Sequence, residues 1–214
     1  MAAPSSGLAQ DWEASWQKGV APSSAWDIGG PYKPLARLLR EGGVPGGRAL
    51  VPGCGRGWDV AALASPDRYV VGLDSSPTAA AIATELLASG GHSAQAHVEC
   101  ADFFSFSGAF HVVFDYTMLC ATLPSRRTEW ARQMRALLVP GGLLLCGEFP
   151  LQPWPRGSEE DLARGPPFQL SSALYRELLE AQGFECVAQS AVRSEESFPL
   201  RAGYEAFSVW RRAP

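Results

Sequence analysis

The chain has 214 residues, of which 46% are hydrophobic and 19% are charged, and its formal net charge is -4. These values are typical of one soluble globular domain with a sizeable core, and they argue against a nucleic-acid partner, because phosphate binding needs a concentrated basic surface. A membrane partner is not expected either, since no apolar run approaches the roughly 18 residues of a membrane span.

Predicted strands and helices alternate along most of the chain. Near the N-terminus, Trp12 and Trp16 are four residues apart and share one face if this segment is helical. Further helices are expected at residues 34–40, 59–64, 78–88, 125–138 and 171–182. Strands are expected at residues 48–51, 69–73, 94–100, 110–116, 143–149, 184–192 and 204–210. This alternation predicts β-α-β units, and therefore an α/β protein whose parallel sheet is covered on both faces.

The chain shows one domain and no internal repeat. We expect residues 1–11 to be a flexible leader and residues 12–214 to form the domain, with a Pro- and Gly-rich loop at residues 150–170. The five cysteines are odd in number, widely spaced and without a C-x-x-C motif. Neither a disulfide framework nor a metal site is therefore expected, and without a recognisable secretory signal the cytoplasm is the expected location.

A glycine-rich turn between the first predicted strand and its helix is the strongest local signal. Gly53, Gly55 and Gly57 allow positive φ and close approach of the backbone to a ligand. The helix that follows offers free N–H groups at its N-terminus. Asp74 ends the next strand, roughly 20 residues after Gly53, where an acid accepts hydrogen bonds from ribose hydroxyls. The alternative is that Asp74 caps the helix that begins near Pro77.

Several features favour S-adenosylmethionine (SAM) over a dinucleotide. In dinucleotide folds a third glycine packs the helix against the strand, and Trp58 occupies that position here. Asp102 and Phe103 follow the third predicted strand, which places an acid and an aromatic ring where an adenine would lie. Tyr116 closes the fourth strand, and a Pro-Gly-Gly turn at 140–142 precedes the fifth. The sequence therefore predicts SAM as cofactor and disfavours an NAD-dependent oxidoreductase.

These motifs resemble those of the plant-type halide/thiol (thiocyanate) methyltransferases within the thiopurine methyltransferase superfamily. The resemblance runs from about Trp12 to Trp210, and its most specific stretches are Val51-Pro52-Gly53-Cys54-Gly55 and Phe114-Asp115-Tyr116-Thr117. It implies the Rossmann-like class I methyltransferase fold, which has a seven-stranded, mostly parallel sheet with the last strand antiparallel and helices on both faces.

The resemblance also implies roles for individual residues. Residues 12–47 would form an N-terminal lid, with Trp12, Trp16 and Trp26 over SAM, although ordinary core packing is the alternative for these side chains. Among the other cofactor contacts, Gly53 would meet the methionine part, Asp74 the ribose, and Asp102 and Phe103 the adenine. Tyr116 would lie beside the sulfonium. Gly55 and Ser75 would also contact the cofactor. Aromatic rings near the sulfonium would add cation–π attraction.

The acceptor side offers three candidate catalytic residues, namely Tyr116, Arg201 and Tyr175. A soft anion needs no general base, but it needs desolvation and a positive partner. Arg201 precedes the last strand and matches a basic family position, and an ordinary surface arginine is the alternative. Tyr175 either reaches the substrate or is a half-buried helix residue. Cys54 is interpreted as a small residue beside the cofactor, because methyl transfer needs no covalent intermediate.

The chain departs from the family pattern in three places. Ser23-Ser24-Ala25 is inserted before Trp26, and Met118-Leu119-Cys120 stands where aromatic or acidic residues are common. Phe168 replaces a common tyrosine, so a substrate-facing hydroxyl would be missing and the pocket would be wider and more apolar.

We predict SAM-dependent methyl transfer to a small sulfur or halide nucleophile, such as a thiol, hydrosulfide, thiocyanate or iodide, by in-line displacement. The expected partner is a small-molecule substrate, and we expect the protein to be a monomer. Two alternatives remain open, namely methylation of larger or aromatic thiols, as for thiopurines, and a catalytically silent SAM-binding regulatory protein.

Overall fold

One sheet organises the protein, whose computed structural model describes residues 10–23, 26–151 and 165–214. Within these residues seven strands lie in the order β3-β2-β1-β4-β5-β7-β6. They are β1 (Gly47–Pro52), β2 (Arg68–Asp74), β3 (Ala96–Cys100), β4 (Phe110–Tyr116), β5 (Leu138–Glu148), β6 (Phe184–Ala191) and β7 (Ala206–Arg212). β1 to β5 pair in parallel, and β7 is antiparallel to both of its neighbours. The predicted mostly parallel sheet with an antiparallel last strand is confirmed.

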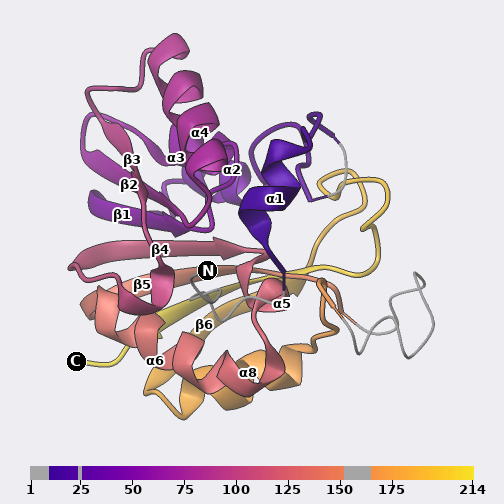
Figure 1. Cartoon of the computed structure of the whole chain (residues 1–214). Helices are drawn as coiled ribbons and strands as arrows, with labels where there is room; N and C mark the ends of the chain where they lie inside the picture. The colour runs from indigo at the N-terminus through magenta and orange to yellow at the C-terminus, as the bar shows by residue number, and fades with distance from the viewer. Residues whose placement is uncertain (1–9, 24–25, 152–164) are drawn as a thin grey trace.

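Helices cover both faces of the sheet, as predicted (Figure 1). The helices are α1 (Trp12–Gln17), α2 (Lys33–Arg40), α3 (Trp58–Leu63), α4 (Pro77–Ser89), α5 (Met118–Ala121), α6 (Arg127–Leu137) and α8 (Ser172–Glu180), with 3-10 turns η1 (Phe103–Ser105) and η2 (Pro124–Arg126). Successive strand residues point to opposite faces. Leu50 and Val113 therefore pack in one cluster with α6 and α8, whereas Ala49 and Val51 pack in the other with α2, α3 and α4.

The strand order opens a crevice at one edge of the sheet. The chain runs outward through β1, β2 and β3 and then returns to the other side of β1 with β4. The ladder between β1 and β4 ends at Leu50 and Val113, whereas the β1–β2 ladder continues to Pro52. The carboxyl ends of β1 and β4 therefore diverge, and this reversal of strand order is where α/β sheets bind ligands.

The Pro-Gly-Gly turn at 140–142 differs from its prediction. The expected helix over 125–138 ends at Leu137, and β5 begins at Leu138 instead of residue 143. Leu138 is extended and pairs with Phe110, after which the register jumps so that Val112 pairs with Leu143. Gly141 has a φ of 77°, so the turn forms an irregularity inside the strand and does not separate helix from strand.

The N-terminal boundary also differs in part. Asp11 caps α1 by accepting a hydrogen bond from the backbone N–H of Ala14 at 3.0 Å, so residue 11 belongs to the start of this helix. Residues 1–9 of the expected leader and residues 152–164, which make up most of the expected loop, lie outside the described residues.

Candidate active site

A cavity of about 460 Å³ opens at the carboxyl ends of the central strands. All predicted cofactor residues except Tyr116 line it, and Arg201 lines it too. These lining residues are Trp12, Trp16, Trp26, Gly53, Gly55, Asp74, Ser75, Asp102, Phe103 and Arg201. Residues that the sequence places far apart therefore form one wall, as the sheet topology requires.

The glycine-rich turn forms the floor of this cavity next to α1. Gly53 and Gly55 have φ values of 62° and 53°, in the left-handed region that favours glycine. A Cβ atom on Gly55 would lie 3.3 Å from the Trp16 ring. The turn thus allows both its own backbone conformation and the close approach of the N-terminal tryptophans.

Asp74 ties the glycine-rich turn to the start of α4. Its Oδ2 accepts a hydrogen bond from the backbone N–H of Gly55 at 2.9 Å, and its Oδ1 accepts one from Ser76 at 2.9 Å. Burial raises the pKa of this carboxyl, and only 8% of the residue is exposed. Each carboxylate oxygen can accept a second hydrogen bond, so Asp74 organises the turn and still offers acceptors to a ligand.

Glu13 fixes α1 to the N-terminus of α4 and is absent from the site residues predicted from the sequence. Its carboxylate accepts hydrogen bonds from the hydroxyls of Ser76 at 2.5 Å and Thr78 at 2.7 Å, and from the backbone N–H of Thr78 at 3.1 Å. These bonds lower its pKa to about 2. A carboxylate here also interacts favourably with the positive end of the α4 dipole. The only sequence signal is an acid between Trp12 and Trp16.

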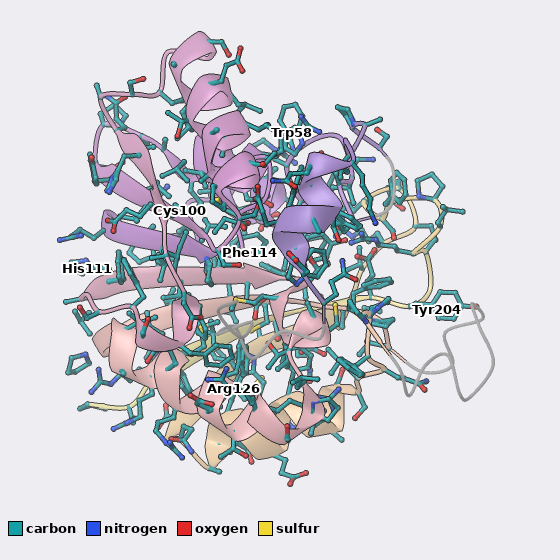
Figure 2. All side chains as sticks on the ribbon, viewed as in Figure 1. Trp58, Cys100, His111, Phe114, Arg126 and Tyr204 are labelled. Atoms are coloured by element: carbon teal, nitrogen blue, oxygen red, sulfur yellow. The ribbon has the colours of Figure 1, made fainter. Side chains whose placement is uncertain are left out.

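Asp27 fixes the second part of the N-terminal segment to the glycine-rich turn. Its Oδ1 accepts a hydrogen bond from the indole N–H of Trp58 at 3.0 Å, and its Oδ2 pairs with Nε of Arg56 at 2.5 Å. Arg56 also donates to the carbonyl of Val20. Figure 2 shows Trp58 on the same side of the molecule as α1. Trp58, which disfavoured a dinucleotide in the sequence, is therefore a docking point for the segment that carries Trp26.

The three N-terminal tryptophans form an aromatic cluster on the cavity wall. The ring of Trp26 meets Trp12 at 5.1 Å and Trp16 at 6.0 Å, both edge to face. The indole nitrogens of Trp12 and Trp26 are buried and have no hydrogen-bond partner among the described residues. Buried donors are normally paired, so these two N–H groups depart from the usual pattern of a buried indole.

Asp102 and Phe103 build the opposite end of the cavity. The side chain of Asp102 caps η1 by accepting a hydrogen bond from the backbone N–H of Phe104 at 3.1 Å. Phe103 is buried, and its carbonyl accepts a hydrogen bond from Gln133 of α6 at 2.8 Å. The guanidinium of Arg126 lies 3.7 Å from the centre of the Phe104 ring. This end is a fixed apolar wall with one carboxylate, which suits a flat heterocycle.

Arg201 lies on the cavity wall and is only 4% exposed, so the alternative of a surface arginine is wrong. Its Nη1 donates to the hydroxyl of Tyr116 at 2.5 Å, and its Nη2 donates to the carbonyl of Trp26 at 3.2 Å. The guanidinium also lies 4.5 Å from the centre of the Phe149 ring. Among the residues that the structure describes, no carboxylate forms a direct ion pair with it.

Two predicted catalytic tyrosines do not line the cavity. Tyr175 is 2% exposed and packs edge to face on Trp130 at 6.1 Å, in the core between α6 and α8. Tyr116 stacks on Tyr32 at 4.0 Å and reaches the cavity only through its hydrogen bond to Arg201. The structure therefore places both residues behind the wall, and we assign neither a direct contact with the reacting atoms.

The residues after Tyr116 line the cavity in its place. Thr117 has a φ of 71°, a conformation that β-branched residues rarely adopt, and it turns the chain from β4 into the short helix α5. Met118 and Cys120 of that helix line the wall. Asp115 holds the helix start by accepting a hydrogen bond from the backbone N–H of Met118 at 3.0 Å. No helix was expected at this position from the sequence.

The cysteines near the cavity are protonated thiols. Burial raises the pKa of Cys120 to about 12, and its thiol donates to the carbonyl of Thr117 at 3.0 Å. Burial also raises the pKa of Cys54 well above its usual range. Since a thiolate is the nucleophilic form, neither side chain competes as a nucleophile, in agreement with the interpretation of Cys54 as a small residue.

Phe168 does not line the cavity either. It is buried, and its backbone N–H donates to the carbonyl of Cys120 at 2.7 Å, whereas its neighbours Pro166 and Pro167 lie on the wall.

Of the described insertion residues, Ser23 has a positive φ of 64°; Ser24 and Ala25 lie outside the described residues. No described helix is long and apolar enough to cross a membrane, and the described residues contain no group of three or more His, Cys, Asp or Glu suited to a metal ion.

A sheet of this order, with a glycine-rich turn after β1, an acid after β2 and an aromatic cavity, defines a class I methyltransferase that uses SAM. The sequence model of the thiopurine S-methyltransferase family matches residues 8–213 of this chain. The chain therefore belongs to the thiopurine S-methyltransferase family.

Relatives and solved structures agree with this assignment. The chain is 40% identical to "Probable thiol methyltransferase 2" of Arabidopsis thaliana, over 94% of this chain and 84% of that protein. It is 36% identical to "Thiocyanate methyltransferase 1" of Brassica oleracea, with the same coverage. A Burkholderia thailandensis 1,6-didemethyltoxoflavin-N1-methyltransferase with bound S-adenosylhomocysteine superposes with a TM-score of 0.71 at 20% identity, covering 100% of this chain and 92% of that chain. The last similarity concerns the fold.

Proposed function

We propose that this enzyme transfers the methyl group of SAM to a small anionic sulfur or halide nucleophile, such as thiocyanate, hydrosulfide or iodide. The observation that carries this proposal is Arg201, a buried cation on the cavity wall without a direct carboxylate partner among the described residues. A buried charge without a direct ion-pair partner is costly, and a bound anion would offset part of that cost. The names of the relatives, a thiol and a thiocyanate methyltransferase, support the same acceptor class.

The cofactor would be held by groups already arranged for it. Gly53 and Gly55 give backbone access, Asp74 offers acceptors to ribose hydroxyls, and Asp102 with Phe103 bounds the adenine end. When bound, SAM supplies an electrophilic methyl group: a lone pair of the acceptor forms a bond to that carbon as the carbon–sulfonium bond breaks, and the bonding pair stays on sulfur.

The protein contributes alignment, a dry site and charge placement. Aromatic rings near a sulfonium each add about 0.5–2 kcal/mol of attraction. Trp16 lies against Gly55 of the glycine-rich turn, and Trp26 packs on both Trp16 and Trp12. Arg201 would hold the acceptor anion, and alignment of the two reactants contributes several kcal/mol. An anionic acceptor attacks the methyl group without first losing a proton, so the reaction needs no general base. We further propose that the protein works as a cytoplasmic monomer.

A panel of acceptors tests this proposal. The purified protein is incubated with SAM and, separately, with thiocyanate, iodide, hydrosulfide and thiophenol, and methylated products are quantified by gas chromatography, with a reaction lacking SAM as control. We expect methyl thiocyanate, methyl iodide or methanethiol to form in preference to methyl phenyl sulfide. Methylation of thiophenol alone would reject the small-anion proposal in favour of larger thiols. If no acceptor is methylated although S-adenosylhomocysteine binds, a SAM-binding regulatory role is favoured.

A further inference from the structure

A chain of hydrogen bonds leads from the cavity to a buried carboxylate that does not line it. Arg201 donates to the hydroxyl of Tyr116 at 2.5 Å, and that hydroxyl lies 2.6 Å from Oε1 of Glu205. The other carboxylate oxygen of Glu205 accepts a hydrogen bond from the hydroxyl of Ser197. Glu205 is 4% exposed, like Arg201. The three side chains therefore form a buried series that ends at the cavity wall.

The chemistry of the donors fixes the direction of these bonds. A guanidinium has no acceptor, so the Tyr116 hydroxyl must accept from Arg201. Its single proton then points to Glu205, which accepts at Oε1. Because Ser197 also donates to this side chain, both oxygens of Glu205 act as acceptors. Burial raises the pKa of Glu205, whereas the hydrogen bonds from Ser197 and Tyr116 and the charge of Arg201 act in the opposite direction and favour a carboxylate one hydroxyl away from the guanidinium.

We propose that Glu205 is a positioning residue that weakens the attraction of Arg201 for anions. The inference rests on the proposed function, in which Arg201 holds the acceptor. Arg201 and Glu205 together carry no net charge, so the carboxylate offsets the charge that the guanidinium brings to the cavity wall. The carboxylate stabilises the guanidinium through Tyr116 without occupying its cavity-facing side. Glu205 therefore makes a reactive anion bind loosely and limits occupancy by unreactive anions.

Neutralising Glu205 tests this proposal. Glu205→Gln keeps an oxygen that can accept from Tyr116 but removes the charge. The Kd of thiocyanate for the complex of the protein with S-adenosylhomocysteine is measured by calorimetry, together with the inhibition constant of perchlorate, an unreactive anion, in the methyl-transfer assay. We expect both constants to fall by about tenfold, which is the scale of the repulsion between two like charges several ångströms apart inside a protein. The Kd of S-adenosylhomocysteine is expected to stay unchanged.

The matched control is Glu196→Gln, which removes the same charge from the same segment. Glu196 pairs with Arg37 at 2.8 Å and does not line the cavity, so its variant is expected to keep both constants. A second variant, Tyr116→Phe, removes the link and leaves both charges, and thiocyanate is expected to bind more weakly because Arg201 loses its anchor. Unchanged or weaker anion binding in Glu205→Gln overturns the inference, as does unchanged binding in Tyr116→Phe.

The binding arm separates this inference from the proposed function. A wild-type protein that binds thiocyanate but does not methylate it would reject the proposed function, and the comparison of Glu205→Gln with Glu196→Gln would still decide the role of Glu205. If wild-type protein methylates thiocyanate and Glu205→Gln behaves as Glu196→Gln does, the inference alone fails.

Discussion

The indole N–H of Trp58 donates to the carboxylate of Asp27 across 3.0 Å, and this bond joins the start of α3 to the segment that carries Trp26. Arg56, two residues earlier, pairs with the other oxygen of the same carboxylate. Asp27 is 6% exposed. The glycine-rich turn, which we propose as a cofactor contact, is therefore tied to the segment that carries Trp26, and we expect cofactor binding to depend on this buried carboxylate.

Asp27→Asn is expected to weaken cofactor binding. The amide keeps one acceptor but loses the charge-assisted bond to Arg56, which is worth about 1.5–3 kcal/mol and corresponds to about a ten- to hundredfold rise in the Kd of S-adenosylhomocysteine. Calorimetry measures this constant. Asp67→Asn is the control, because Asp67 is exposed and does not line the cavity. Equal affinities in the two variants would remove Asp27 from the cofactor site.

Arg201→Ala is expected to raise the KM for thiocyanate by about tenfold or more, because the anion loses a charged donor worth about 1.5–3 kcal/mol. Arg201→Lys keeps the charge but not the planar donor set, so an intermediate KM is expected. The Kd of S-adenosylhomocysteine should not change in either variant. Arg193→Ala, at an exposed position of the same segment, is the control. A parallel loss of cofactor and thiocyanate affinity would place Arg201 outside the acceptor site.

Gly55→Ala is expected to weaken cofactor binding for two reasons, namely a strained backbone conformation and a close contact of the new side chain with Trp16. The left-handed conformation costs a side-chain-bearing residue about 1–2 kcal/mol, and the new Cβ would lie 3.3 Å from the Trp16 ring. Gly91→Ala is matched, because Gly91 has a φ of 75° and nothing within 4 Å of the added Cβ. Thermal unfolding should show similar losses of stability in both variants, and calorimetry should show weaker S-adenosylhomocysteine binding only in Gly55→Ala. Weaker S-adenosylhomocysteine binding in both variants would mean that the loss of affinity follows from reduced stability of the fold and not from a contact at Gly55.

Asp115 is expected to make the protein less stable as the pH rises from about 5 to about 7. Burial raises its pKa to about 7, above the ordinary value of 3.8. The folded state therefore holds a proton that the unfolded chain has released, and the stability this provides is present at low pH and lost as pH rises through the folded pKa. The slope is at most about 1.4 kcal/mol per pH unit for one group.

Urea unfolding across this pH range measures that slope in wild type and in Asp115→Asn. The variant is also expected to lose stability at every pH, because its amide has only one oxygen to accept from Met118 and from Trp130. The informative quantity is the slope, which should be smaller in the variant. An unchanged slope would assign the pH dependence to other groups, such as Asp59, whose pKa burial also raises to about 7.

Most of the cofactor side of the cavity could be predicted from local spacing. Gly53, Gly55, Asp74 and Asp102 each lie at or just after the carboxyl end of a strand, and parallel strands bring those ends to one edge. The position of Tyr116 could also have been predicted, by asking which face of β4 each of its residues occupies. Residues two apart share a face, so Tyr116 lies with Phe114 against Tyr32 on the α2 side, and the turn at Thr117 brings the next residues to the cavity instead.

The contacts that hold the site together could not be predicted in this way. Glu13 meets Ser76 across 63 positions of sequence, and Tyr116 meets Glu205 across 89. No local spacing encodes such pairs, because they depend on how α1 and the segment before β7 pack on the sheet. The Pro-Gly-Gly turn shows a second limit, since a positive-φ glycine can either end an element or interrupt a strand, and only the pairing of Leu138 with Phe110 decides between them.

The most direct test of the central claim is the fate of a labelled methyl group. Wild-type protein is incubated with thiocyanate and SAM that carries a deuterated methyl group, and both products are quantified by mass spectrometry. The proposed function predicts trideuteromethyl thiocyanate and S-adenosylhomocysteine in equal amounts. Absence of the labelled product under conditions where S-adenosylhomocysteine binds, and thiophenol takes up the label, would contradict methyl transfer to a small anion.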